Sequence, residues 1–179
     1  MVDPPADETA VSTVANQLLT CLCDTLELYP NPPQNCCLRV GDLVIQDWNA
    51  EAGVDVSCCP GLAYVRIGSM YPSSNFPIPD TEPGKGNSCY PVAWAVELTI
   101  GTVRCIPGMG TPAGPTCVDW TVAAQTDMND MEAFRKALCC WSPLLPKGRL
   151  WIAGTSTVNL TADCIERSLP VLVAIPRCC

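Results

Sequence analysis

Cysteine is the residue type that offers this chain the most chemistry. The sequence of 179 residues contains 14 cysteines, a density typical of disulfide-rich secreted scaffolds. Eight of them form adjacent pairs, at Cys36-Cys37, Cys58-Cys59, Cys139-Cys140 and Cys178-Cys179. Neighbouring Cα atoms are about 3.8 Å apart, below the usual range for a disulfide. We therefore expect the two members of a pair to have separate partners. On a helix, Cys21 and Cys23 would also face different ways.

Three kinds of cysteine chemistry fit this pattern to different degrees. Zinc requires four cysteine or carboxylate ligands here, because the chain contains no histidine. The repeated C-x2–4-C spacing of a zinc ribbon is missing as well, which argues against a metal site. The interpretation that the cysteines are buried free thiols, which pack as small hydrophobic groups, remains open. Structural disulfides, formed after the protein leaves a reducing compartment, also remain open.

The other reactive residue types do not form a catalytic pattern. Without histidine, neither a serine–histidine nor a cysteine–histidine arrangement is possible. The segment "GKG" at 84–86 lacks the strand and helix that flank a phosphate-binding loop. We interpret Asp127 and Asp130 as helix-solvating or capping residues. The sequon Asn159-Leu160-Thr161 carries little weight without a secretion signal. The sequence thus predicts no enzyme, with no catalytic, cofactor-binding or metal-binding residue.

Composition predicts one folded domain over residues 1–179. Hydrophobic residues make up 48% of the chain and charged residues 16%, enough to build a core. The net charge is −8 and the ten basic residues are scattered, which argues against tight nucleic-acid binding. The start "MVDPPADETA" lacks the basic and apolar regions of a secretory leader. We expect synthesis in the cytoplasm and no membrane span, because no apolar stretch approaches about 20 residues.

Apolar residues at spacings of three and four predict two helices, over 7–29 and 116–141. The first has a capping acid at Asp3 or Asp7 and ends at Pro30. Its apolar positions are Val11, Val14, Leu18, Leu22 and Leu26. The second ends before Pro143, and its apolar positions are Trp120, Ala124, Met128, Met131, Phe134, Leu138 and Trp141. We interpret both stripes as core, since such stripes are usually buried.

The remaining apolar segments predict strands. Their ranges are 36–48, with one or two strands around Gly41, then 62–71, 92–106, 149–160 and 167–176. In 62–71 one face consists of Leu62, Tyr64 and Arg66, which is typical of a half-buried strand. In 92–106 one face consists of Val92, Trp94, Val96, Leu98 and Ile100. That segment exceeds the usual strand length, so we expect it to project beyond the sheet. Pro170 favours an edge or a strand start.

Loops rich in proline and glycine separate these segments, at 30–35, 72–91 and 107–115. The loop 72–91 is too long for a plain connector, and Phe76 within it points to docking on a partner or on the domain itself. Because loops rather than helices join the strands, we predict an α+β fold. It consists of an antiparallel β-sheet with two helices packed on one face.

Several of these segments, in their order and spacing, resemble the tail terminator proteins of long-tailed phages of actinobacteria. One match runs from Gly61 to Pro77 and contains the strand "LAYVRIGSMYPSSNFP". A second runs from Val92 to Pro107 and ends in Arg104, Cys105 and Pro107. The N-terminal helix, the helix "TCVDWTVAAQTDMNDMEAFRKALCCW" and the final "TADCIERSLPVLVAIP" extend the match over most of the chain. Residues 161–164, Thr-Ala-Asp-Cys, replace the Gly-Gly-Cys turn of that family.

The resemblance implies a structural role in the virion. The subunit would close into a six-membered ring that caps the head-proximal end of the tail tube and stops its growth. Its partners would be other copies of itself, the tail tube protein and the head–tail connector or stopper protein. DNA would pass through an acidic lumen without specific binding. Lysis would expose the cysteines to an oxidising environment.

Two other functions remain open on the sequence. The chain could be another neck protein of the same virion, a head–tail connector or stopper. It could instead be a secreted cysteine-rich binding module. The position of the protein in the particle distinguishes a tail terminator from another neck protein. Mass spectrometry with and without alkylation tests the second, because a secreted module would oxidise its cysteines early.

Overall fold

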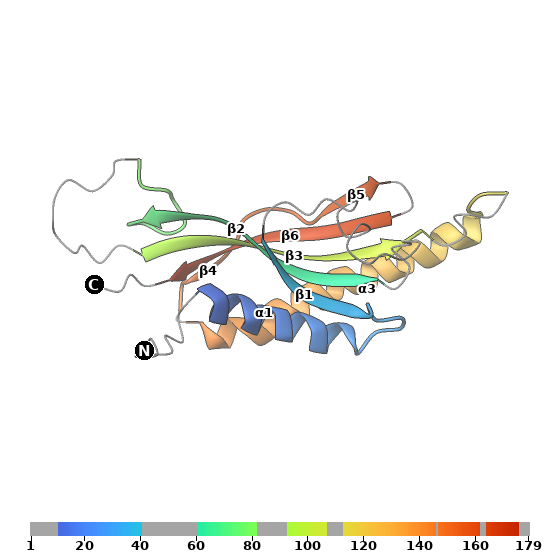
Figure 1. Ribbon diagram of the computed structural model, residues 1–179, viewed down its shortest axis with the longest axis horizontal. Coiled ribbons are helices and arrows are strands. Elements are labelled where there is room, and N and C mark those ends of the chain that lie inside the picture. Colours follow the sequence, from blue (N-terminus) through green and yellow to red (C-terminus); the bar gives the residue numbers. More distant parts are fainter. Residues whose placement is uncertain are drawn as a thin grey trace, which may run out of the picture.

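The computed structural model describes residues 11–40, 61–81, 93–106, 113–145, 147–161 and 164–175. Figure 1 shows these residues as a long twisted sheet with helices on one side. The elements in chain order are α1 (Val11–Leu26), β1 (Asn35–Val40), β2 (Leu62–Ser73), β3 (Ala93–Cys105), α3 (Cys117–Trp141), the 3-10 helix η1 (Ser142–Leu144), β4 (Leu150–Ile152), β5 (Thr157–Thr161) and β6 (Cys164–Ile175). The predicted α+β class is confirmed.

The six strands form one mixed sheet. Its order is β1-β2-β3-β6-β4, and β5 also pairs with β6. Every pairing is antiparallel, as predicted, except that β1 and β2 run parallel. A parallel pair requires a crossover connection of a dozen or more residues. The 21 residues from 41 to 61 lie between β1 and β2 and are numerous enough for it.

Both helices pack on the same face of the sheet, and the main core lies between them. On α1 the buried residues include Leu18, Leu22 and Leu26. The matching sheet positions alternate along each strand and include Val65, Val96, Leu98, Ile100, Val171 and Val173. Full burial of one such leucine stabilises the fold by roughly 1.5–3 kcal/mol. The apolar periodicity of α1 is thus explained by burial. Its predicted caps Asp3 and Asp7 lie outside the described residues.

The strand β3 is central, which corrects the prediction that this segment projects beyond the sheet. It pairs with β2 from Ala93 to Val103 and with β6 from Trp94 to Cys105. Neighbouring strands therefore pair with β3 on both sides along most of its length. Both of its faces are buried, because Val96 and Leu98 face the helices while Ala95 and Thr99 on the other face are also buried.

The segment 149–160 forms two short strands rather than one. The strands β4 and β5 both pair with β6, and residues 153–156 separate them. Pro170 lies opposite this gap, where its carbonyl accepts a hydrogen bond from the Ala153 amide at 3.1 Å. A residue in a strand directs its N–H and its C=O to the same side, so the N–H that proline lacks faces the gap. Pro170 therefore lies inside β6, not at a strand start or on an edge strand as predicted.

The helix α3 begins at a capping box and ends where it was predicted. Thr116 accepts a hydrogen bond from the Asp119 amide, and the Asp119 carboxylate accepts one from the Thr116 amide at 2.7 Å. Hydrogen bonds from the Thr116 hydroxyl and, to a smaller extent, from the Thr116 amide lower the pKa of Asp119. The first turns of α3 extend past the end of the sheet (Figure 1). None of the helices in the described ranges has the length and apolar character of a membrane span.

Candidate functional site

The apolar stripe of α3 is divided between core and surface, which corrects the prediction that all of it is core. Phe134, Leu138 and Trp141 are buried. The earlier positions are not, and Trp120, Met128 and Met131 are 44%, 54% and 44% exposed. The helix rests on the sheet through another line of residues, which includes Ala123, Asp130, Ala133 and Ala137. The first half of the stripe therefore lies on a flank of α3 rather than under it.

An apolar groove of about 850 Å³ runs along this flank. The α3 side is formed by Met128, Met131, Phe134, Leu138 and Cys139, and the sheet side by Leu150, Ile152 and Leu169. The groove therefore lies between α3 and the β4 margin of the sheet. The two helices cover the rest of this face, since α1 packs against β1, β2 and β3, and α3 against β3 and β6. Leu150 of β4 packs against the core, but Ile152 of β4 and Val158 and Leu160 of β5 remain exposed.

The strand β5 continues the apolar surface. Val158 lies opposite Arg167 and Leu160 opposite Ile165 in the register of β5 with β6. Directly opposed residues point to the same face, and Arg167 contacts α3. Val158 and Leu160 therefore lie on the helix-bearing face, where they are 42% and 60% exposed. We call Trp120, Met128, Met131, Ile152, Val158 and Leu160 together the open flank.

One ion pair marks the solvent side of the groove. Arg135 donates two hydrogen bonds to Glu132, at 2.8 and 2.6 Å, across one helical turn. Arg135 lowers the pKa of Glu132, and Glu132 raises the pKa of Arg135. Both side chains are exposed, so the pair contributes little to stability. It leaves the apolar floor of the groove free to contact another surface.

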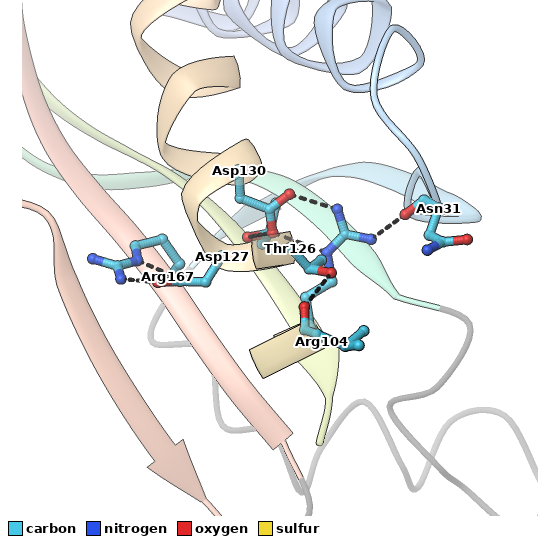
Figure 2. Close-up of polar contacts among 8 residues, drawn as sticks. Asn31, Arg104, Thr126, Asp127, Asp130 and Arg167 are labelled. Atoms are coloured by element: carbon cyan, nitrogen blue, oxygen red, sulfur yellow. Dashed lines mark hydrogen bonds and ion pairs between the residues drawn. The ribbon is translucent and has the colours of Figure 1, made fainter. Parts of the chain in front are cut away.

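The α1 side of α3 carries a buried ion pair instead (Figure 2). Asp130 is 1% exposed and accepts hydrogen bonds from Arg104, at 2.9 and 2.5 Å, and from the Thr102 hydroxyl at 2.8 Å. Arg104 also donates to the carbonyl oxygen of Asn31 at 2.7 Å. Arg104 therefore joins β3, α3 and the connector that follows α1. A buried carboxylate with these partners is satisfied rather than reactive.

A second ion pair repeats this arrangement one turn earlier in α3. Asp127 accepts two hydrogen bonds from Arg167 of β6, whose guanidinium also reaches the Ser156 hydroxyl at 3.3 Å. Asp127 and Asp130 thus bind arginines of two neighbouring strands (Figure 2). The interpretation of these acids as helix-solvating or capping residues is therefore wrong. The sequence could not reveal the pairs, because 26 and 40 residues separate their members.

These residues line a polar cavity of about 540 Å³ beside the connector. Gly61 and Asn31 contribute to its wall. Gly61 has a φ of 72° and a Cβ there would lie 3.2 Å from the Cα of Pro33, so glycine suits this position. Both carboxylates and both arginines in the cavity are paired with one another. The cavity therefore offers no uncompensated charge for a ligand.

On the other face of the sheet, the Tyr64 ring packs against Gly101. The Tyr64 hydroxyl donates to Glu166 at 2.6 Å, and burial together with this contact raises the pKa of Tyr64 well above its usual range. A Cβ on Gly101 would lie 2.3 Å from the Tyr64 ring. The ring thus occupies the space that any larger residue at 101 would need.

The start of the proline-rich segment 72–91 folds back onto β2. The Tyr71 hydroxyl donates to the carbonyl of Pro77 at 3.0 Å, and the Ser73 hydroxyl to that of Ile78 at 2.7 Å. Residues 72 and 73 belong to β2 itself. Phe76, predicted to dock, is half-buried within this turn. Residues 82–91 lie outside the described part of the chain.

The cysteines form disulfides that tie α1 to its neighbours. Cys21 is bonded to Cys140 of α3 and Cys23 to Cys36 of β1, with Cα atoms 5.9 and 6.3 Å apart. Cys105 and Cys164 are disulfide-bonded as well. For two pairs the prediction that adjacent cysteines do not bond each other is confirmed, but Cys37 and Cys139 are free thiols rather than bonded to partners of their own. Cys21 and Cys23 face different elements, as predicted. Two other pairs, 58–59 and 178–179, lie outside the described residues.

The free thiols differ in their surroundings. Cys139 and Cys117 are exposed on α3, and Cys37 is half-buried on β1. Burial raises the pKa of Cys37, against the opposing effect of Arg39, which keeps this thiol protonated. Within the described ranges no three histidine, cysteine or carboxylate side chains are grouped so that they could hold a metal ion.

The molecule thus presents a large apolar surface beside satisfied polar networks. Comparison of the chain with known protein families and with curated proteins finds no match to either. An exposed apolar groove bordered by charged side chains is a typical contact surface for another protein.

Proposed function

We propose that this protein is a structural subunit of a phage virion, a tail terminator. In this role six copies close into a ring on the head-proximal end of the tail tube. The ring stops tube polymerisation and then contacts the connector or stopper protein of the head. Subunits are made in the host cytoplasm and act in the neck of the particle.

The open flank is the observation that carries this proposal. A subunit that works by contact needs apolar surface that its own fold leaves uncovered, and Met128 and Ile152 are each 54% exposed. A heterologous contact between identical subunits generates a ring when the rotation closes. The segments Gly61–Pro77 and Val92–Pro107 add the resemblance in sequence.

The polar residues support a structural role. Arg104 belongs to the segment that resembles tail terminators, and it binds Asp130 and the Asn31 carbonyl. An arginine used in this way stiffens the subunit instead of acting on a substrate. The net charge of −8 suits a ring whose lumen passes DNA, because like charges repel.

Deletion of the gene from the phage genome tests the terminator function. We expect tail tubes of variable and excessive length that do not join heads, seen by electron microscopy of lysates. Complementation with the intact gene restores fixed length. Tails of normal length in the deletion would contradict the proposal. Tails of normal length that fail to join heads would favour a connector or stopper.

A further inference from the structure

The charges of this chain are segregated along its sequence. Residues 1–60 contain nine acids and one base, Arg39, which accounts for a net charge of −8. Residues 61–179 contain nine acids and nine bases and are neutral overall. Within this part the structure describes residues 11–40, which include α1 and β1 and in which the acids are Asp24 and Glu27 and the base is Arg39. We call α1 and β1, together with residues 27–34 that connect them, the α1–β1 side.

The groove lies in the most basic stretch of the chain. Residues 132–161 contain four bases, Arg135, Lys136, Lys147 and Arg149, and a single acid, Glu132. Arg135 lines the groove directly. Lys147 and Arg149 precede Leu150, which forms its sheet wall. A groove with basic neighbours complements exposed acidic side chains, such as Asp24 and Glu27, on another copy.

The sheet order places the two surfaces at opposite margins. The strand β1 is at one end of the strand order, and β4 and β5 are at the other. Figure 1 shows α1 and β1 on the side of the molecule away from β5. A contact between opposite margins of identical subunits is heterologous, so it can propagate from copy to copy and close a ring.

The α1–β1 side also carries apolar side chains that could enter the groove. Val40 at the end of β1 is 83% exposed and Leu28 just after α1 is 76% exposed. They are the two most exposed large hydrophobic residues in the described ranges. Asp24 of α1 and Glu27, which follows α1, are exposed nearby in sequence. This side thus offers the apolar and acidic groups that the groove and its basic neighbours would bind.

We propose that the apolar groove between α3 and β4 binds the α1–β1 side of a second copy of this chain. This contact rests on the proposed function, for which it supplies the subunit interface of the ring. Met131 and Ile152 form the receiving surface, and Leu28 and Val40 the entering one. The basic residues 135, 147 and 149 bind the neighbouring acids and set the direction of assembly.

Complementary blocking of the two surfaces tests this contact. A groove variant carries Met131→Glu and Ile152→Glu, and an edge variant carries Leu28→Glu and Val40→Glu. All four residues are exposed, so circular dichroism and melting temperature should match the wild type. Met70→Glu is the matched control, because Met70 on β2 is 54% exposed, the same as Ile152. Native mass spectrometry and sedimentation velocity report the oligomeric state of the full chain.

We expect the wild type and the Met70→Glu variant to form closed oligomers and each blocked variant to remain monomeric. An equimolar mixture of the two blocked variants should form dimers and nothing larger, because only one intact contact is available. A mixture that stays monomeric would overturn the proposal, as would assembly by the groove variant alone. A wild type that stays monomeric up to millimolar concentration would overturn it too.

This test is separate from the test of the proposed function. If the mixture forms dimers but gene deletion leaves tails normal, the contact stands and the terminator function fails. If the deletion gives overlong tails but the blocked variants still assemble, the terminator function stands and the contact fails. If the groove variant assembles but no longer enters virions, the groove binds another virion protein and the proposed contact is wrong.

Discussion

The two flanks of α3 differ in what covers them. On the α1 side, the Cys21–Cys140 disulfide crosses between the helices, Asp130 binds Arg104, and the Lys136 ammonium lies 4.9 Å from the centre of the Tyr29 ring. On the other side, Met128 and Met131 face solvent above a groove. The same helix thus stabilises the subunit through one flank and offers the other for contact. Mutations on the two flanks should therefore affect different properties.

Mutation of the buried ion pair should reveal the largest difference in stability between the two flanks. Asp130→Ala leaves Arg104 without its carboxylate partner in a site where its side chain is only 15% exposed. We expect the free energy of unfolding to fall by roughly 3–5 kcal/mol, measured by urea denaturation. Glu132→Ala, on the open side, should cost far less because its pair with Arg135 is exposed. Equal losses in both variants would contradict the comparison.

Removal of the interhelical disulfide should have the next largest effect on stability. Replacing Cys21 and Cys140 by serine removes a bond that closes a loop over a sequence separation of 119 residues. The stability should drop by roughly 2–5 kcal/mol under oxidising conditions, measured by thermal or urea unfolding. Cys139→Ser replaces an exposed free thiol and should leave the melting temperature unchanged. A loss of stability in that control would show that the open side also holds the fold together.

A glycine on the far face of the sheet should have a smaller effect. Gly101→Ala places a methyl group where the Tyr64 ring lies, so the ring must move and its bond to Glu166 weakens. We expect a loss of roughly 1–3 kcal/mol from overpacking, measured by urea denaturation. Gly68→Ala is the matched control, because its nearest non-neighbouring atom would be 3.4 Å away. If both glycines tolerate alanine equally, the Tyr64 ring does not fill the space at Gly101.

The capping box of α3 should give the smallest effect, which depends on pH. The pKa of Asp119 is lowered in the folded state, so its contribution to stability is present above the usual carboxyl pKa. The contribution is lost as the pH falls through the lowered value. Asp119→Asn should therefore lower the melting temperature at pH 7 and make little difference in strong acid. A difference from the wild type that grows on acidification would contradict this sign.

Periodicity predicted the parts of the fold that the chain buries within itself. The stripe of α1 corresponds to a buried face, and Thr116 marks the start of α3. The prediction of a half-buried strand is wrong for the start of β2, because Leu62 to Val65 are buried on both faces of the sheet. For the first half of the α3 stripe, periodicity wrongly predicted burial. An apolar flank has the same spacing whether its own sheet or another protein covers it, so periodicity alone cannot separate Met128 from Leu138.

The two arginine–aspartate pairs could not be predicted from the sequence, for another reason. Arg104 and Asp130, like Arg167 and Asp127, lie far apart in the chain and meet only because β3 and β6 are neighbours under α3. The interior position of Pro170 likewise depends on the gap between β4 and β5. Local patterns identify segments, whereas these contacts depend on how the segments are assembled.

The bond between Cys21 and Cys140 has a topological consequence. It encloses the strands β1, β2 and β3 in one covalent circle that begins on α1 and ends on α3. A protease that cleaves the backbone once anywhere inside this circle leaves both fragments attached to each other. Only a second break, or reduction of every disulfide that spans the cut, removes the covalent link between them. The oxidised subunit thus keeps its parts together after a single cut that would otherwise release the entire N-terminal helix.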